Sequence, residues 1–493
     1  MGFEKLISGT DIRGIVSDFE EKKANLTEKE VKEIAEAFGK WITQKCEKSA
    51  KNESRNIRVA VGYDARHTGP LFSEIIRDEL KSQGIDVLNC KMSITPSLFM
   101  TTIFPSYKSD AAIMITASHL PSYYNGIKFF TKDGGVEKED LFEMVKFLKK
   151  SKKVGKGNET VKNLADDYAK YLCELIRKEA NNGEKPLENL KIVIDAGNGA
   201  AGFFAEKVIN ELGGDSKGSQ FLNPDGDFPN HVPNPEVPEA INSIKEAVLK
   251  SNADFGIIFD ADGDRSAFID KSGREINRNR LIALVSDILL KQKPNGIIVT
   301  DSITSTELTK FIESRNGIHH RFKRGYKNVI NEAKRLNAEG KYSPLAIETS
   351  GHAALINNYF LDDGAYMAAL LLIQLVQSKK ENIDFTAVLN ELGEPAEEKE
   401  LRIKIEDDNF RELGNKILKD LEEYVKTIKN WEKVEPNYEG VRVNVDKDNW
   451  FLIRMSLYEP LFCINIETSE VGKLSKILKE IYKFLGKYKQ VKI

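Results

Sequence analysis

Three segments of the sequence share one pattern, a short apolar run that ends at an aspartate. They are residues 58–64, 191–195 and 296–301. Each run is followed by a loop and a stretch with helical periodicity, and short β-branched runs that alternate with helices are typical of buried parallel strands in βαβ units. The recurrence of this pattern predicts three similar α/β domains.

The length and the polar stretches indicate where these domains end. A chain of 493 residues is too long for one hydrophobic core, because single cores stop growing near ~250 residues. Polar connections lie at 146–160, 273–279 and 377–400, and a different α+β pattern follows the last of them. We therefore expect α/β domains at 1–155, 156–274 and 275–385 and a smaller α+β domain at 396–493.

Charge, hydropathy and cysteine content exclude several classes of protein. The net charge of -3, with acidic and basic residues interspersed, argues against a nucleic-acid or membrane-surface partner and favours a small charged ligand. No apolar segment approaches the ~18 residues of a membrane span, and the first residues lack a signal-peptide pattern. The scattered cysteines suggest neither a zinc site nor a disulfide framework, which predicts a reducing, cytoplasmic location. They are Cys46, Cys90, Cys173 and Cys463.

A serine follows another apolar run, which predicts a buried strand at 111–115. Ser118 and His119 lie at the carboxyl end of this strand, where open α/β sheets bind ligands. We do not expect His119 to be the base for Ser118, because neighbouring side chains in an extended chain point apart. A nucleophile elbow is also excluded, since Thr116 and Leu120 replace its two glycines. From these surroundings alone, Ser118 is either a nucleophile or a turn residue that precedes a helix.

Three carboxylates at alternate positions follow the apolar run 255–259. They belong to Asp260, Asp262 and Asp264. Such a set suits a hard cation such as Mg²⁺, which binds oxygen ligands and commonly shares them with substrate phosphates. A calcium-binding EF-hand is excluded, because Arg265 and Lys271 occupy positions that require glycine and glutamate. The alternative without a metal is an acidic turn neutralised by Arg265.

A third motif places a carboxylate, a hydroxyl and an imidazole after the apolar residues 346–347. Glu348 and Ser350 suit the binding of vicinal sugar hydroxyls. The ordinary pKa of His352, near ~6.5, suits proton transfer, with a structural role as the open alternative. A nearby basic loop is a candidate for binding a negatively charged ligand, or else an ordinary solvated turn. It contains Lys323, Arg324, Gly325 and Tyr326.

Two further segments contain an arginine in a suggestive setting. Arg454 and Ser456 lie at the end of an apolar run, with Tyr458 in the loop that follows. A guanidinium group, a hydroxyl and backbone N–H groups together form a workable phosphate clamp. Arg13, within the turn-prone segment 8–14, is either a ligand contact or an ion-paired turn residue.

In this order, the motifs resemble the α-D-phosphohexomutase superfamily, and most closely its phosphomannomutase/phosphoglucomutase members. The resemblance spans nearly the whole chain. The segments that carry it are 11–14, 116–119, 125–128, 225–229, 233–236, 260–265, 348–352 and 454–456.

The resemblance implies four domains around a central cleft, three of them α/β with mixed, largely parallel sheets. It implies that Ser118 becomes phosphorylated and that its phosphoryl oxygen and the three aspartates coordinate Mg²⁺. The enzyme would exchange the 1- and 6-phosphates of a hexose, such as glucose or mannose. The reaction would pass through a hexose 1,6-bisphosphate, which would also act as an activator.

The resemblance also implies roles for the other candidates. Lys128 and His352 would transfer protons, and Lys128 with Arg265 would neutralise the moving phosphoryl group. His119 and Arg13 would support the serine loop. The remaining candidates would bind substrate, with Arg454 and Ser456 on the phosphate that is not transferred. They are Lys323, Arg324, Gly325, Tyr326, Glu348, Ser350, Arg454, Ser456 and Tyr458.

Two departures from the family pattern put affinity and sugar specificity in question. Leu120 stands where the family usually has asparagine, and Leu457 and Tyr458 stand where a small residue and a threonine are usual. Two other functions remain as alternatives. One is a haloacid-dehalogenase-like phosphatase with Asp260 as its nucleophile, and the other is a catalytically silent sugar-phosphate-binding paralogue. The sequence indicates neither the preferred hexose nor the oligomeric state.

Overall fold

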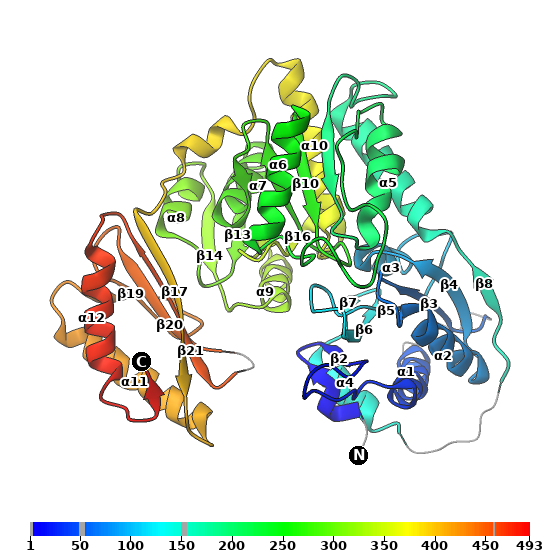
Figure 1. Ribbon diagram of the computed structural model, residues 1–493, viewed down its shortest axis with the longest axis horizontal. Coiled ribbons are helices and arrows are strands. Elements are labelled where there is room, and N and C mark those ends of the chain that lie inside the picture. The colour runs from blue at the N-terminus through cyan, green and yellow to red at the C-terminus, as the bar shows by residue number, and fades with distance from the viewer. Residues whose placement is uncertain (1–2, 49–54, 149–154, 457–458) are drawn as a thin grey trace. The chain divides into compact units, whose positions relative to one another are not determined.

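The computed structural model describes residues 3–48, 55–148, 155–456 and 459–493 (Figure 1). The chain divides into two compact units. The first comprises Met1–Ile276, Ser350–Ala353 and Leu361–Phe385, and the second comprises Asn277–Thr349, Ala354–Phe360 and Thr386–Ile493. Within the described part of the chain, no helix is long and apolar enough to cross a bilayer.

The first unit begins with an eight-stranded mixed sheet in the order β1-β2-β6-β5-β3-β4-β8, with β7 paired to β6. Its strands are β1 (Ile7–Ser8), β2 (Asp11–Ile15), β3 (Arg58–Tyr63), β4 (Asp86–Met92), β5 (Ala111–Ile115), β6 (Tyr124–Thr131), β7 (Gly134–Gly135) and β8 (Glu159–Val161). Strands β5, β3, β4 and β8 run parallel, whereas β6 pairs antiparallel with both β2 and β5. Strand β8 therefore belongs to the first sheet, although it follows the boundary expected at residue 155.

Helices cover both faces of this sheet, because its strands are apolar on both sides. Val59, Val61 and Ile113 share a core with α1 (Glu28–Lys48), α2 (Gly69–Ser82) and α4 (Lys138–Val145). On the other face, α3 (Thr95–Met100) and α5 (Leu164–Ala180) pack against β3, β4 and β5. The 3-10 helix η1 (Phe3–Leu6) precedes β1.

A second sheet in the same unit has the order β12-β11-β10-β9. Its strands are β9 (Ile192–Asp195), β10 (Phe255–Phe259), β11 (Ser266–Asp270) and β12 (Glu275–Ile276). Strands β9 and β10 are parallel, and β10 pairs antiparallel with β11. Helices α6 (Pro238–Ser251) and α10 (Gly364–Lys380) pack against it (Figure 1). Helix α10, from the expected third domain, thus packs within the first unit.

The helical stretch expected after β9 takes an unusual form. A 3-10 helix, η2 (Ala200–Gly202), and a π-helix, η3 (Ala205–Asn210), replace a regular α-helix. A side chain at Gly202 would place its Cβ only 1.9 Å from the carbonyl oxygen of Leu222. This close approach of two backbone segments shapes the turn, since only glycine leaves room for it.

The second unit contains a sheet in the order β14-β13-β15-β16. Its strands are β13 (Ile297–Thr300), β14 (Ile318–Arg321), β15 (Leu345–Ile347) and β16 (Ala353–Leu355). Strand β13 runs parallel to both β14 and β15. The associated helices are α7 (Arg278–Gln292), α8 (Thr306–Glu313) and α9 (Tyr326–Ala338), with the short 3-10 helices η4 (Ile356–Asn358) and η5 (Ala387–Glu391).

The C-terminal part of the second unit is a separate antiparallel sheet in the order β18-β19-β20-β21-β17-β22. Its strands are β17 (Glu397–Ile405), β18 (Glu432–Lys433), β19 (Val441–Asn444), β20 (Trp450–Met455), β21 (Leu461–Thr468) and β22 (Val491–Lys492). Helices α11 (Phe410–Thr427) and α12 (Lys473–Leu485) bury one face of this sheet in a shared core. Three α/β domains followed by an α+β domain are thereby confirmed.

Candidate active site

The serine loop in the first unit connects two antiparallel strands, β5 and β6, rather than a strand and a helix. The expectation that Ser118 precedes a helix is therefore wrong. Ser118 is 2% exposed and has a φ of 53°, a left-handed conformation that non-glycine residues seldom adopt. Its backbone N–H donates to Thr116 Oγ1 at 2.8 Å. This local bond holds the serine in its unusual backbone geometry.

Arg66 organises the backbone of the same loop. Its Nη1 donates to the carbonyl oxygens of Pro121 and Tyr124, each at 2.8 Å. Its Nη2 donates to those of Ser118 at 2.7 Å and Leu120 at 2.5 Å. Leu120 thus contributes its main-chain carbonyl to the loop, a contact that does not depend on its side chain.

The sequence analysis overlooked Arg66, although it stands two residues after the aspartate that ends β3. Asp64 Oδ2 lies 3.3 Å from Arg66 Nε and accepts a hydrogen bond from Thr116 Oγ1 at 2.6 Å. Burial raises the pKa of Asp64 to about 6, against the opposing charge of Arg66. Buried charges are normally paired. An arginine two residues after a strand-ending aspartate was therefore the sequence feature that could have identified Arg66.

The three aspartates occupy the turn between β10 and β11. They are fully or almost fully buried, and their ligand atoms lie within 4.8 Å of one another. Asp260 Oδ2 accepts a hydrogen bond from Ser118 Oγ at 3.2 Å. This contact joins the serine loop to the aspartate turn, two motifs that lie far apart in the sequence.

The aspartate turn has the chemistry of a divalent-cation site. Asp262 Oδ1 and Asp264 Oδ1 are buried and have no hydrogen-bond partner among the described residues. Burial raises the pKa of Asp260 well above its ordinary value, and the neighbouring carboxylates raise it further. Buried carboxylate oxygens that lack a hydrogen bond, beside mutually repelling carboxylates, fit a hard cation such as Mg²⁺.

Lys128, on β6, supplies the nearest ammonium group. Its Nζ lies 2.6 Å from Asp264 Oδ2 and 3.0 Å from Asp262 Oδ2. Although burial disfavours the ionised form of Asp264, Lys128, His352 and Arg265 hold its pKa well below the ordinary value. The turn therefore combines a firmly ionised carboxylate with positive side chains that face it.

His119 lies closer to Ser118 than we expected from the sequence. Its Nδ1 is 3.3 Å from Ser118 Oγ and 2.5 Å from Arg265 Nη2. The left-handed backbone of Ser118 brings the two neighbouring side chains together, so the expectation that they point apart is wrong. Burial and the charge of Arg265 lower the pKa of His119 to about 2, which leaves a neutral ring.

Arg265 and Arg13 add positive charge around the serine. Arg265 is buried, and its Nε lies 3.2 Å from Asp260 Oδ2. Arg13, on β2, pairs with Asp11 Oδ2 at 3.0 Å.

Opposite Arg13 in the sheet stands Gly126, where an added Cβ would lie 2.4 Å from the carbonyl oxygen of Ile12. The close packing of β2 on β6 thus requires glycine there.

His352 also belongs to the first unit. Its Nδ1 forms a short hydrogen bond with Asp362 Oδ2, while Asp362 Oδ1 accepts the backbone N–H of Ala353 at 2.9 Å. Burial disfavours the imidazolium, but the carboxylate of Asp362 raises the pKa of His352 above its ordinary value. Asp362 is a second residue that the sequence analysis missed. The available sign in the sequence was a pair of aspartates, Asp362 and Asp363, that precede α10.

The basic loop and Glu348 lie in the second unit. Gly325, with a φ of 115°, precedes α9, and its backbone N–H donates to Glu348 Oε1 at 2.5 Å. Lys323, Arg324 and Tyr326 flank this glycine. Ser350 falls in the first unit with His352, whereas Glu348 and the basic loop belong to the second unit, where Glu348 bonds to Gly325.

A third missed residue, Glu439, connects the basic loop with Arg454. Its Oε2 accepts hydrogen bonds from the Arg324 backbone N–H at 3.0 Å and from Ser302 Oγ at 2.6 Å. Its Oε1 lies 3.7 Å from Arg454 Nη1. The one sequence feature that could have identified Glu439 was its position directly before Gly440.

The loop after Arg454 is described only in part. Ser456 Oγ accepts the backbone N–H of Glu459 at 3.2 Å. Tyr458, a candidate for phosphate binding, lies outside the described residues.

Comparison with known proteins identifies the family. Models described as phosphoglucomutase/phosphomannomutase alpha/beta/alpha domains I, II and III match residues 5–154, 166–273 and 277–392. A phosphomannomutase/phosphoglucomutase of Pseudomonas syringae pv. tomato is 30% identical over 471 residues, which cover 95% of this chain and 92% of the relative. The chain belongs to the phosphoglucomutase/phosphomannomutase family.

Other members of the family agree with this identification. A phosphoglucomutase of Neisseria meningitidis is 29% identical, over 95% of this chain and 94% of the relative. The crystal structure of a phosphoglucomutase/phosphomannomutase family protein from Burkholderia thailandensis superposes with a TM-score of 0.81 at 25% identity, covering 98% of both chains. The chain is thus a phosphohexomutase, an intramolecular phosphotransferase whose family membership implies a metal-dependent reaction. The phosphatase and silent-paralogue alternatives are not favoured.

Proposed function

We propose that Ser118 carries the phosphoryl group that this phosphohexomutase transfers. The observation that carries the proposal is the contact of Ser118 Oγ with Asp260 Oδ2 at 3.2 Å, within a cluster of three aspartates and Lys128. A phosphoserine at this place would meet metal-binding oxygens on one side and positive side chains on the other. Phosphoryl transfer depends mainly on such positioning and charge neutralisation.

In the first step, a free hydroxyl of a hexose phosphate attacks the phosphorus of phosphorylated Ser118. The bond between phosphorus and Ser118 Oγ breaks, and the electron pair stays on Oγ. The sugar becomes a hexose 1,6-bisphosphate. After this intermediate turns around, Ser118 Oγ attacks its other phosphoryl group, so that the phosphoserine is regenerated and the isomeric hexose phosphate leaves.

His352 is our candidate for the proton of the attacking hydroxyl. Asp362 bonds to its Nδ1, and we assign to Nε2 the acceptance of that proton and its later return. Lys128 is the second candidate for proton transfer. Arg265 and Lys128 would face the charge that develops on the moving phosphoryl group, while Arg13 and His119 support the serine loop.

The aspartate turn is our proposed Mg²⁺ site, made of Asp260, Asp262, Asp264 and an oxygen of phosphorylated Ser118. A bound Mg²⁺ would neutralise charge on the transferring group and orient it. The two unpaired carboxylate oxygens described above support this assignment. We further propose that added hexose 1,6-bisphosphate acts as an activator, because it phosphorylates Ser118 in enzyme that has lost its phosphoryl group.

For the substrate we propose the 1- and 6-phosphates of glucose, mannose or both. The names of the relatives from Pseudomonas and Neisseria include phosphoglucomutase and phosphomannomutase, which supports this choice. Glu348, Ser350 and the loop from Lys323 to Tyr326 are the proposed contacts to the sugar, and Arg454, Ser456 and Tyr458 those to the phosphate that is not transferred. From the scattered cysteines we also propose a cytoplasmic location.

The test combines phosphoryl labelling with turnover. Incubation with radiolabelled glucose 1,6-bisphosphate should label the wild type and Ser122→Ala, an exposed serine in the same loop, but not Ser118→Ala. Turnover of glucose 1-phosphate and mannose 1-phosphate should disappear only in Ser118→Ala. Label on Asp260 instead of Ser118, with full activity of Ser118→Ala, would support the phosphatase mechanism and overturn the proposal.

A further inference from the structure

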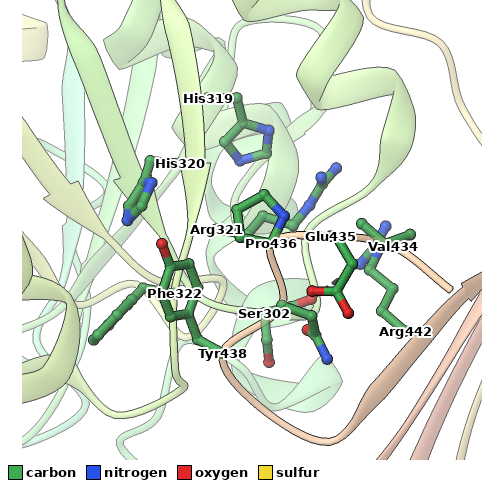
Figure 2. A pocket seen from close by; sticks show the side chains of 11 residues that line it. Ser302, His319, His320, Arg321, Phe322, Val434, Glu435, Pro436, Tyr438 and Arg442 are labelled. Atoms are coloured by element: carbon green, nitrogen blue, oxygen red, sulfur yellow. Dashed lines mark hydrogen bonds between the residues drawn. The ribbon is translucent and has the colours of Figure 1, made fainter. Parts of the chain in front are cut away.

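A pocket in the second unit lies outside the residues assigned to the mutase reaction. It encloses about 660 Å³, part of it open to solvent, between the end of β14 and the segment 434–438 that precedes β19. Ser302, Phe322 and Arg442 also line it (Figure 2). About 200 Å³ of this space can hold water-sized molecules.

Arg442 is the most unusual group in this pocket. Its side chain is 2% exposed and its guanidinium stacks on Trp450, with Cζ 3.5 Å from the ring centroid. Nη1 donates to the carbonyl oxygen of Ser302 at 2.9 Å, whereas Nη2 is buried without a hydrogen-bond partner among the described residues. A buried cationic N–H group left unpaired is costly.

Arg321 brings a second guanidinium to the pocket. It donates to neutral oxygens, among them the carbonyl of Ser305 at 2.7 Å and Thr309 Oγ1 at 2.5 Å. Among the described residues, no carboxylate lies within ion-pair distance of either Arg321 or Arg442. The pocket therefore has two positive charges without a direct partner, and such charges are normally paired when buried.

Glu467 and Asp301 act electrostatically on both arginines and Glu313 acts on Arg321, but among the described residues none of the three forms an ion pair with either guanidinium. Glu435 lines the pocket but is paired with Lys433 at 2.8 Å. Glu467, which faces Arg442 from β21, accepts a hydrogen bond from Trp450 Nε1 at 2.9 Å, and no described residue forms an ion pair with it. Burial raises the pKa of Glu467 to about 7, so it is only partly ionised at neutral pH.

The two histidines of the pocket add no counter-charge. His319 bonds to Thr309 Oγ1 at 2.8 Å, and burial together with the charge of Arg321 lowers its pKa well below the ordinary value. His320 Nε2 lies 2.9 Å from Glu332 Oε1, so the carboxylate of Glu332 is paired with His320 and not with an arginine of the pocket.

We propose that the pocket binds a phosphate group, whose two negative charges match the two guanidinium groups. An aromatic wall beside it suits the organic part of a phosphate monoester. The ring centroids of Phe322 and Tyr438 lie 4.8 Å apart, and Figure 2 shows them on the side opposite Arg442. Inorganic phosphate and a phosphate monoester share the recognised chemistry, and the experiment below separates them.

Hydrogen bonds connect this pocket to the basic loop. Arg442 Nη1 bonds to the carbonyl of Ser302, and the hydroxyl of Ser302 donates to Glu439 at 2.6 Å. The same Glu439 oxygen accepts the backbone N–H of Arg324. The phosphate site would therefore be a second ligand site, connected through Ser302 and Glu439 to the loop that we assign to the sugar.

A substitution at Val434 can test the proposal without removing a buried arginine. A glutamate there would place a negative charge in the pocket beside Arg442. Its backbone N–H donates to the Arg442 carbonyl at 2.9 Å, and it lines the same pocket. Directly paired residues on antiparallel strands point to the same face. Glutamate at 434 should therefore pair with Arg442, while glutamine is a matched control of similar size without charge.

The experiment measures binding of inorganic phosphate and of adenosine 5′-monophosphate to the full chain by calorimetry. We expect Val434→Glu to bind both probes at least tenfold more weakly than Val434→Gln and to unfold at a higher temperature in phosphate-free buffer. Because phosphate can also bind near Arg454, the result is the difference between the two variants. Tighter binding of adenosine 5′-monophosphate than of phosphate would identify a monoester as the ligand, and equal binding would identify free phosphate.

Equal binding to the two variants, or a lower unfolding temperature for Val434→Glu than for Val434→Gln, would overturn the proposal. Mutase turnover of the wild type is measured separately with glucose 1-phosphate. A failure of the pocket proposal therefore leaves the test of the proposed function unaffected.

Discussion

Arg66 Nη2 donates a hydrogen bond to the main-chain carbonyl of Ser118 at 2.7 Å, across 52 residues of sequence. The same guanidinium bonds to three further carbonyls of the serine loop. Ser118 therefore owes its place beside the aspartate turn to a buried side chain from the preceding part of the sheet. A planar guanidinium with several N–H groups suits this task better than an ammonium group.

Replacement of Arg66 by lysine should lower kcat about 10²-fold with little change in KM. One ammonium group cannot reach all four carbonyls, so the loop loses its shape. A misplacement of the reacting group by about 1 Å lowers the rate of a transfer reaction about 10²-fold. Steady-state kinetics and the rate of Ser118 labelling measure the effect. Arg58→Lys, at the other end of β3, is the matched control, and an equal loss in both variants would contradict the assigned role.

The left-handed backbone of Ser118 predicts different stabilities for two inactive variants. Ser118→Gly should be more stable than Ser118→Ala by about 1 kcal/mol, because a φ of 53° is strained for any residue with a Cβ. Urea unfolding of the two variants measures this difference. Equal midpoints would show that the loop relaxes to another backbone conformation when the hydroxyl is removed.

Loss of the Lys128 ammonium should make the fold depend on a divalent cation. Without Mg²⁺, Lys128→Met should lose about 3 kcal/mol of unfolding free energy, since Asp262 and Asp264 lose the buried ammonium group that pairs with both of them. Added Mg²⁺ should restore most of it. In the wild type, chelation should abolish turnover reversibly. Lys132→Met, at an exposed position in the turn directly after β6, is the control, and no effect of Mg²⁺ on either variant would argue against the metal site.

Asp362 should act through His352. Asp362→Asn is expected to lower kcat about 10²-fold, because the ring loses the carboxylate that orients it. The double variant with His352→Gln should be no slower than His352→Gln alone, as for residues that act as a unit. Additive losses in kcat would indicate that Asp362 has a separate, structural function.

Glu467 predicts a pH-dependent stability. Burial raises its pKa from 4.5 to about 7, and Glu398 adds to this, while Arg442 and Arg321 oppose it. Protonated Glu467 makes its full contribution to the stability of the folded state below pH 4.5, and this contribution is lost as the pH rises through about 7. Glu467→Gln should thus match the wild type at pH 4 and exceed it by about 3 kcal/mol at pH 8. Urea unfolding at both pH values tests this, and a difference that grows toward low pH would contradict it.

Sequence patterns predicted the strands that carry the site more reliably than the contacts within it. Strand β5 has the predicted bounds 111–115, because a run of five apolar residues has to be buried and β-branched side chains favour extended backbone. The aspartate turn was predicted for a similar reason, since its three carboxylates are neighbours in the chain. The geometry of His119 was not predicted, because it depends on a positive φ at Ser118, which the pattern of residue types in the loop does not indicate.

The sequence by itself determined the four-domain α/β and α+β plan, the serine loop, the aspartate turn and the family. These features rest on local periodicity and on motifs whose residues are close together in the chain. Only the tertiary structure decided that Arg66 holds the serine loop, that Lys128 faces Asp262 and Asp264, and that Asp362 orients His352. Each of these contacts joins separate elements, so it depends on how strands and helices pack and on which charges burial leaves to be paired.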